Sequence, residues 1–210
     1  MTDSLKPPAS RAARGGPAKR ERLVGAAREL FHEQGVEKTT IADISQRAKV
    51  LPGNIYYYFK TKDDVIEAVI GSRARDLREL ITQIEQRHRT PQSRLKALAA
   101  ALAGHGDTLA RYGCPFGTLC SELDKRADGP RASSPELMRI PVDWAEEQFR
   151  SMGRPDARDL AVEFIAAYQG TALLANTFDD PKLMASTVRR LAHWVDTLSS
   201  DRPADEPGSG

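Results

Sequence analysis

Apolar side chains recur every three or four positions along most of the chain, which is the spacing of one face of an α-helix. The pattern predicts long helices over residues 17–33, 62–87, 156–176 and 181–198, with shorter helices in the intervals. A long alternation of apolar and polar residues, as a half-buried strand would show, occurs nowhere in the sequence. We therefore expect an all-α protein.

Two short helices joined by a tight turn are predicted within residues 39–60. We expect Thr39 to be the N-cap of the first, because its hydroxyl can accept a hydrogen bond from an exposed amide of the first turn. The apolar face of that helix comprises Ile41, Ile44 and Ala48. Pro52 suits the first turn of the second helix, and Ile55 and Phe59 then point into the core. This is a helix-turn-helix arrangement, whose second helix is placed to enter the major groove of DNA.

The outer face of the second helix is polar and aromatic, which indicates contact with a partner rather than packing. It presents Gly53, Asn54, Tyr56, Tyr57 and Lys60. The stretch from about residue 18 to residue 70 resembles the TetR family of bacterial repressors. The resemblance rests on Thr39-Thr40, on the turn Ala48-Lys49-Val50-Leu51, on the run Tyr56-Tyr57-Tyr58-Phe59 and on Lys62.

Two positions depart from the family pattern. Lys49 stands where the family has a glycine, and a residue other than glycine carries a steric penalty in the left-handed conformation expected there. Leu51 stands where the family has a capping serine, and its side chain cannot accept a hydrogen bond. These departures concern the start of the recognition helix and leave the expected fold unchanged.

The resemblance implies an N-terminal three-helix head that binds a double-stranded DNA operator, and a larger helical body that binds a small-molecule effector. The residues expected at the DNA are Thr39, Thr40, Gly53, Asn54, Tyr56, Tyr57, Lys60 and Lys62. Those expected at the effector are His105, Tyr112, Cys114, Phe116, Cys120, Trp144, Phe164 and Tyr168. We also expect a homodimer through the two C-terminal helices. The helix over 156–176 is apolar on two sides, and its small residues Ala166 and Gly170 would let a second copy approach closely.

Charge is distributed unevenly along the 210 residues, whose net charge is +2. Residues 1–62 hold 12 Lys or Arg and 6 Asp or Glu, a net charge of +6, and the remainder has a net charge of −4. A basic front part suits a DNA-binding head. The predicted organisation is a disordered basic arm over 1–16, a helix-turn-helix domain over 17–62, a ligand-binding and dimerisation domain over 63–200, and a disordered tail over 201–210.

The middle of the body holds three local signals. Gly104-His105-Gly106 interrupts an apolar pattern, and the helix there either bends toward a ligand or ends at Ala103 and restarts. Residues 125–134 predict an exposed, mobile loop. Ser134 is then expected to cap a helix in which Pro141 introduces a kink or a restart.

Catalytic and metal-binding patterns are missing from the sequence, which has no Gly-rich phosphate loop, no nucleophile elbow and no His/Cys cluster with metal spacing. Cys114 and Cys120 match neither a CxxC motif nor a zinc pair. The best catalytic alternative has Cys114 as nucleophile and His105 as base, and we expect no enzyme, no cofactor and no metal. No stretch approaches the roughly 18 apolar residues of a membrane span, and no signal peptide is recognisable, so a cytoplasmic protein without a membrane partner is expected.

Two alternatives to a repressor released by a ligand are open from the sequence. One is an architectural DNA-binding protein without a ligand, although most of the chain lies behind the head. The other is a repressor that senses oxidants or electrophiles through Cys114 or Cys120. Cys114 is the better candidate, because Arg111 is close in sequence and a helix starting near Phe116 would add its dipole.

Overall fold

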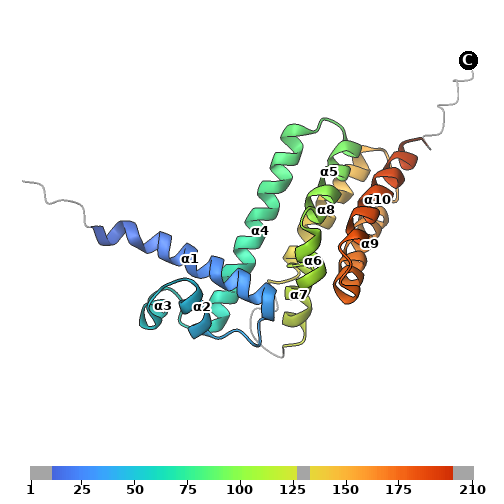
Figure 1. Ribbon diagram of the computed structural model, residues 1–210. Coiled ribbons are helices and arrows are strands. Elements are labelled where there is room, and N and C mark those ends of the chain that lie inside the picture. Colours follow the sequence, from blue (N-terminus) through green and yellow to red (C-terminus); the bar gives the residue numbers. More distant parts are fainter. Residues whose placement is uncertain (1–10, 127–132, 201–210) are drawn as a thin grey trace, which may run out of the picture. The chain divides into compact units, whose positions relative to one another are not determined.

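The computed structural model describes residues 11–126 and 133–200, which form ten α-helices and no strand. The expected all-α class is thereby confirmed. The helices are α1 (Arg11–Gln34), α2 (Ile41–Arg47), α3 (Pro52–Tyr58), α4 (Lys62–Arg87), α5 (Pro91–Ala103), α6 (Gly106–Tyr112), α7 (Gly117–Asp124), α8 (Glu136–Ser151), α9 (Ala157–Phe178) and α10 (Lys182–Ser200) (Figure 1). Within the described ranges, no helix is both long and apolar enough to cross a membrane.

The helices group into two compact units, and the boundary between them falls within α4, between Ser72 and Arg73. The first unit contains α1, α2, α3 and the start of α4. The second contains the rest of α4 and the helices from α5 to α10. The boundary lies later in the chain than the division expected after residue 62. The reason is that Val65 and Ile66, on the first turn of α4, are fully buried and belong to the first unit.

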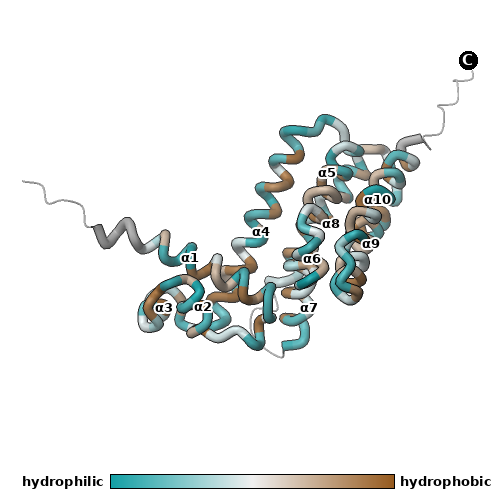
Figure 2. Tube along the Cα trace, viewed as in Figure 1, coloured by the Kyte–Doolittle hydropathy of each residue, from teal (hydrophilic) through white to brown (hydrophobic). Residues whose placement is uncertain are grey.

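The apolar periodicity of the first unit is buried as the sequence predicts. Its buried side chains include Leu23, Ala27, Leu30, Phe31, Ile44, Ala48, Ile55 and Phe59. Figure 2 shows the same periodicity in α4, where apolar positions recur as separate bands along the helix. The start of α1 differs from the prediction, because the helix already begins at Arg11 and contains Pro17, which we had expected as its first residue. Of the arm expected to be disordered over 1–16, residues 11–16 are helical, so that part of the prediction was wrong. Residues 1–10 and the expected tail over 201–210 lie outside the described residues.

The second unit is organised around α9, which packs against α8, α10 and α6, while α10 also packs against α5. Three aromatic rings meet in its core. The ring of Phe149 lies 6.2 Å from that of Phe164 and 5.9 Å from that of Trp194, measured between centroids. Phe149 and Phe164 are fully buried, and Leu95, Leu98 and Leu160 belong to the same cluster. One helix therefore supplies much of the apolar surface that holds this unit together.

Three local predictions in the second unit have clear outcomes. The chain ends α5 at Ala103 and restarts with α6 at Gly106, so the helix does not continue through the two glycines. The N-cap of α8 is Pro135, and the prediction of Ser134 was wrong. Ser134 is buried, and its carbonyl accepts hydrogen bonds from the Leu137 amide and the Cys120 thiol. Pro141 lies inside α8, which continues through it. Of the predicted mobile loop, residues 127–132 lie outside the described part of the chain.

The aromatic cluster yields a stability prediction. Phe149→Ala should lower the free energy of unfolding by about 3–5 kcal/mol, because it removes a fully buried ring and leaves a cavity between Phe164 and Trp194. Urea denaturation followed by circular dichroism measures the loss. Ser151→Ala, an exposed change at the end of the same helix, should stay within about 0.5 kcal/mol of wild type. Equal effects of the two substitutions would contradict the assignment of Phe149 to the core.

Candidate functional site

The start of α2 is closed by a reciprocal pair of hydrogen bonds between Thr40 and Asp43. The Thr40 hydroxyl accepts from the Asp43 amide at 3.1 Å, and the Asp43 carboxylate accepts from the Thr40 amide at 2.8 Å. This is a capping box, which satisfies two amides that the helix itself leaves unpaired. The hydroxyl and amide of Thr40 lower the pKa of Asp43, because both donate to its ionised carboxylate.

Thr39 does not have the role that the sequence predicted for it. The N-cap of α2 is Thr40, and Thr39 is completely buried. Its hydroxyl donates to the carbonyl of Gly35 at 2.7 Å and accepts a longer hydrogen bond from the Gln34 amide. A hydroxyl in this position is not accessible to a phosphate, so Thr39 is removed from the DNA-facing set.

The turn between α2 and α3 passes through a left-handed residue. Lys49 has a φ of 54°, as the sequence predicted for the position where the resembled family has a glycine. The amide of Lys49 donates to the carbonyl of Gln46 at 3.0 Å, and the amide of Val50 donates to that of Ser45 at 2.9 Å. These two bonds form a Schellman motif, which reverses the chain after α2. A non-glycine residue in this conformation costs about 1–2 kcal/mol.

The outer face of α3 is exposed as the sequence predicted. Tyr57 is 81% exposed and Tyr56 53%, and Leu51, just before the helix, is 74% exposed. Gly53 and Asn54 are also exposed, and nothing lies within 4 Å of the place where a Cβ of Gly53 would be. Ile55 and Phe59 on the opposite face are buried. Large apolar and aromatic side chains at such exposure mark a contact surface.

The two predicted cations after α3 lie close to backbone carbonyls. Lys60 is exposed, and its ammonium group donates to the carbonyl of Tyr56 at 2.9 Å. Lys62 is half-buried, and its ammonium group donates to the carbonyl of Glu37 at 3.4 Å. Both acceptors are neutral carbonyls, so neither of these two bonds is an ion pair. Neighbouring Asp64 accepts from the amides of Thr61 and Lys60, which lower the pKa of its carboxyl group.

An ion-pair network joins α2 to α1. The guanidinium group of Arg47 contacts the carboxylate of Glu33 at 2.8 Å and that of Glu29 at 3.2 Å. Hydrogen bonds that Arg47 donates to these two carboxylates, first to Glu33, raise the pKa of its guanidinium group. Glu29 and Glu33 of α1 are therefore already paired with an arginine of α2.

The residues predicted for effector binding are not gathered in one place. Cys114, Phe116 and Tyr168 belong to one apolar cluster. Trp144 and Phe164 belong to the separate cluster around Phe149. The remaining three lie in neither cluster, since His105 is exposed, Tyr112 lies beneath the Arg111 guanidinium at 5.0 Å, and Cys120 donates to Ser134.

Cys114 is the centre of a buried group of polar atoms. Its sulfur lies 3.8 Å from the Tyr168 hydroxyl and 3.5 Å from the Gly117 amide, and both can donate to it. The carbonyl of Leu102 lies 3.1 Å from the same hydroxyl and is the alternative acceptor for its single proton. Burial raises the pKa of Tyr168, so it remains a neutral donor. Burial likewise raises the pKa of Cys120 to about 11, which keeps that second thiol protonated at neutral pH.

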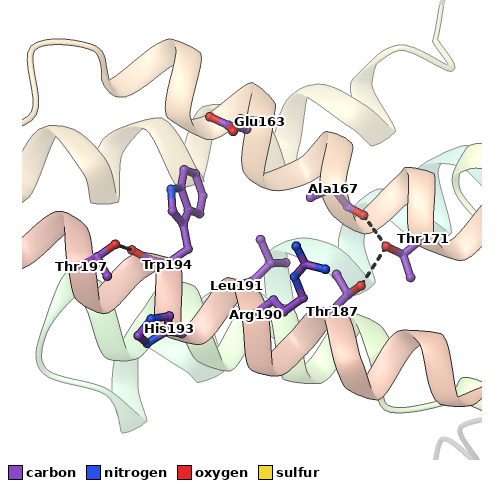
Figure 3. Close-up of a pocket in the computed structure, with 9 residues that line it drawn as sticks. All are labelled: Glu163, Ala167, Thr171, Thr187, Arg190, Leu191, His193, Trp194 and Thr197. Atoms are coloured by element: carbon purple, nitrogen blue, oxygen red, sulfur yellow. Dashed lines mark hydrogen bonds between the residues drawn. The ribbon is translucent and has the colours of Figure 1, made fainter.

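Two open grooves lie on the second unit, and the sequence predicted neither. The first runs between α9 and α10, with a volume of about 530 Å³ (Figure 3). Its lining residues are Glu163, Ala167, Thr171, Thr187, Arg190, Leu191, His193, Trp194 and Thr197. The second groove, of about 540 Å³, lies between α10 and the α5–α6 junction and includes Asp107 and Lys182. The first groove could have been anticipated from the polar residues that recur every three or four positions on α10.

A stripe of exposed apolar and small residues follows α9. Leu173 and Phe178 are each 65% exposed, and Val162 and Leu174 are each 48% exposed. Ala166 and Gly170 are also exposed on this helix. We call these six residues the α9 stripe. The opposite side of α9 contains buried Phe164 and Tyr168, which confirms that the helix is apolar on two sides.

Comparison with known proteins agrees with this architecture. The model of the family described as bacterial regulatory proteins, tetR family, matches residues 23–69. The transcriptional repressor DhaR of Mycobacterium sp. strain GP1 is 30% identical over 165 residues, which cover 73% of this chain and 80% of DhaR.

Solved structures share the fold over most of the chain. A TetR-family transcriptional regulator from Streptomyces coelicolor superimposes with a TM-score of 0.75 at 20% identity, covering 87% of this chain and 97% of that one. The regulatory protein TetR from Rhodobacter sphaeroides gives a TM-score of 0.72 at 24% identity, with 83% and 97% covered. At these identities the structures support the fold alone, whereas the family rests on the sequence matches.

Proposed function

The chain belongs to the TetR family of bacterial regulatory proteins, and on this premise we propose that it is a homodimeric repressor released from a palindromic operator by a small molecule. The family consists of DNA-binding transcriptional regulators and not of enzymes, which confirms those two expectations. Operator binding, dimerisation and the effector are the proposed parts. A chromosomal operator would also place the protein in the bacterial cytoplasm.

The observation that carries the proposal is the exposed face of α3. Asn54 can pair with a base edge through its amide, and Gly53 and Tyr57 would approach the bases or the groove walls beside it. Tyr56, Lys60 and Lys62 are proposed to contact phosphates, together with the exposed Thr40. No residue of α3 itself carries a charge. The proposed charge attraction to the DNA phosphates therefore comes from Lys60 and Lys62, which follow the helix, and the proposed base contacts come from the helix itself.

The homodimer is proposed to form on the α9 stripe. Exposed apolar side chains of this size on a helix are typical of a protein interface. Small Ala166 and Gly170 would let the α9 of a second copy approach closely. The neighbouring groove presents Glu163 on α9 and Arg190 on α10, opposite charges that a two-fold axis can bring together across the interface. Two heads held in this way would read half-sites about 34–36 Å apart.

The effector is proposed to bind in the second unit and to act through α4. The guanidinium group of Arg73, the first α4 residue of that unit, lies 5.7 Å from the ring centroid of Phe116. Phe116 packs against the cluster that contains Cys114 and Tyr168. A ligand that displaces Phe116 would therefore disturb its contact with Arg73 on α4, a helix that continues into the DNA-binding unit. Only a ligand that prefers the non-binding arrangement relieves repression.

A second candidate effector is an oxidant or electrophile that reacts with Cys114. Its sulfur lies within reach of the Gly117 amide and the Tyr168 hydroxyl, which fix the position of the thiol inside the second unit. With a quinone, the thiolate would add to a ring carbon, and the quinone oxygens would take up protons to give a hydroquinone thioether. Cys114 is only 4% exposed, so the reagent has to be small. The raised pKa of Cys120 keeps that thiol protonated and makes it a poor nucleophile.

The first prediction separates the two kinds of DNA contact. Asn54→Ala should lower the preference for promoter DNA over a mixed-sequence duplex by about tenfold, the value of one base contact. Lys62→Ala should weaken binding to both duplexes alike and reduce the salt slope by about 0.9 for each phosphate that is no longer neutralised. Fluorescence anisotropy with the DNA upstream of its own gene measures both effects. Wild-type protein that binds this DNA no better than the mixed-sequence duplex would contradict the proposed function.

The second prediction tests the dimer. Nothing lies within 4 Å of the place of a Gly170 Cβ, so Gly170→Arg should leave the folded protomer intact. The long charged side chain should separate the two copies and abolish high-affinity operator binding without altering the head. Analytical ultracentrifugation should show a monomer for Gly170→Arg and a dimer for the size control Gly170→Ala. A wild-type monomer at micromolar concentration would exclude the interface.

The third prediction decides between the two kinds of effector. If Cys114 is the sensor, peroxide or a quinone should release wild-type protein from promoter DNA and should fail to release Cys114→Ser. Cys120→Ser serves as the control and should still respond. Equal release of wild type and Cys114→Ser, or release of neither, would exclude the thiol sensor and leave a non-covalent effector.

A further inference from the structure

Lys49 occupies a backbone position that disfavours it. Lys49 and Asp179 are the two non-glycine residues with positive φ in the described ranges. Aspartate tolerates the left-handed region because its short side chain can bond locally, whereas lysine has no such compensation. The two Schellman hydrogen bonds that close α2 require this conformation at Lys49, and glycine is the residue that fits it without strain. Lysine at this position therefore destabilises the turn relative to glycine and adds no hydrogen bond to it.

The side chain of Lys49 has no intramolecular role among the described residues. It is exposed, and it makes no hydrogen bond or ion pair there. Two acidic groups of α1, Glu29 and Glu33, are paired with Arg47, which lies two residues before Lys49. A strained residue with an uncompensated charge points to a partner outside the protomer.

The position of Lys49 along the chain indicates which partner this is. It lies three positions before Pro52, the first residue of α3, whereas Lys60 and Lys62 follow the helix. Between Lys49 and Lys60 the chain carries no other charged residue, so Lys49 is the cation at the N-terminal end of α3. That end leads directly to Gly53 and Asn54, the residues assigned to the bases.

We propose that Lys49 is an additional DNA-contacting residue, which binds a backbone phosphate at the entry of α3. The inference rests on the proposed operator binding and adds a residue to it. A lysine ammonium is a point charge that contributes to binding of every sequence and carries no base preference. The strained lysine in the turn thus lowers the stability of the fold and raises the affinity for DNA. Replacing Lys49 with a neutral residue that fits the turn should therefore raise stability and weaken DNA binding.

Lys49→Gly tests this opposition in the full-length protein. It should raise the thermal midpoint by about 2–4 °C, because the strain is relieved. It should also weaken binding roughly five- to tenfold, on promoter DNA and on a mixed-sequence duplex alike. Between about 50 and 200 mM salt, the slope of log affinity against log salt should fall by about 1.8 for the two protomers of a dimer.

Three further variants separate charge from strain and from net charge. Lys49→Arg keeps both the charge and the strain, and it should bind DNA like wild type. Lys49→Asn tolerates the left-handed backbone but is neutral, and it should bind as weakly as Lys49→Gly. Arg87→Gln removes the same charge at the far end of α4, about 38 Å along the helix from Lys62, and it should leave the salt slope unchanged.

These measurements distinguish a failure of the Lys49 contact from a failure of the proposed function. If wild type prefers its promoter while Lys49→Gly retains the same affinity and slope, the Lys49 contact is wrong and the proposed function stands. If Arg87→Gln lowers the slope as much as Lys49→Gly, the effect is one of net charge and the contact is again wrong. If wild type shows no preference for promoter DNA, the proposed function fails together with this inference.

Discussion

The reversal of the chain after α2 is the constraint on which the DNA-facing surface depends. Two backbone hydrogen bonds close it, from Val50 to Ser45 and from Lys49 to Gln46, and both require a left-handed residue between the helices. The reversal sets the rotation of α3, so that Ile55 and Phe59 enter the core while Asn54 and Tyr57 remain exposed. A short helix of seven residues has little stability of its own, and its orientation therefore comes from this turn and its buried face.

The second unit relies in a comparable way on α9. Its buried side supplies Phe164 to the aromatic cluster and Tyr168 to the polar group around Cys114. Its other side leaves Leu173 and Phe178 open to solvent in the protomer. A helix that is apolar on two sides is stable in solution when a second surface covers the exposed side. The same helix thus links the core, the candidate effector region and the proposed dimer interface.

Elements with strong periodicity were predictable, and positions that depend on neighbouring elements were not. The bounds of α4 agree with the prediction, because its apolar spacing is regular and uninterrupted. The N-cap of α2 was assigned to Thr39 and is Thr40, since both can cap a helix and only packing decides which hydroxyl is buried against Gly35. The restart at Gly106 was one of two alternatives, which the sequence left open because glycine permits both.

The sequence by itself determined the helical class, the helix-turn-helix and the outward set on α3, because local periodicity, turn residues and a specific motif act over a few positions. The tertiary structure decided which residues share a site. Eight effector candidates were expected from the family resemblance, and packing placed Phe164 and Tyr168, one helical turn apart on α9, in different clusters. It also created the groove between α9 and α10, whose lining combines residues from two helices. A groove of this kind depends on which helices become neighbours, and that is settled only when the whole core packs.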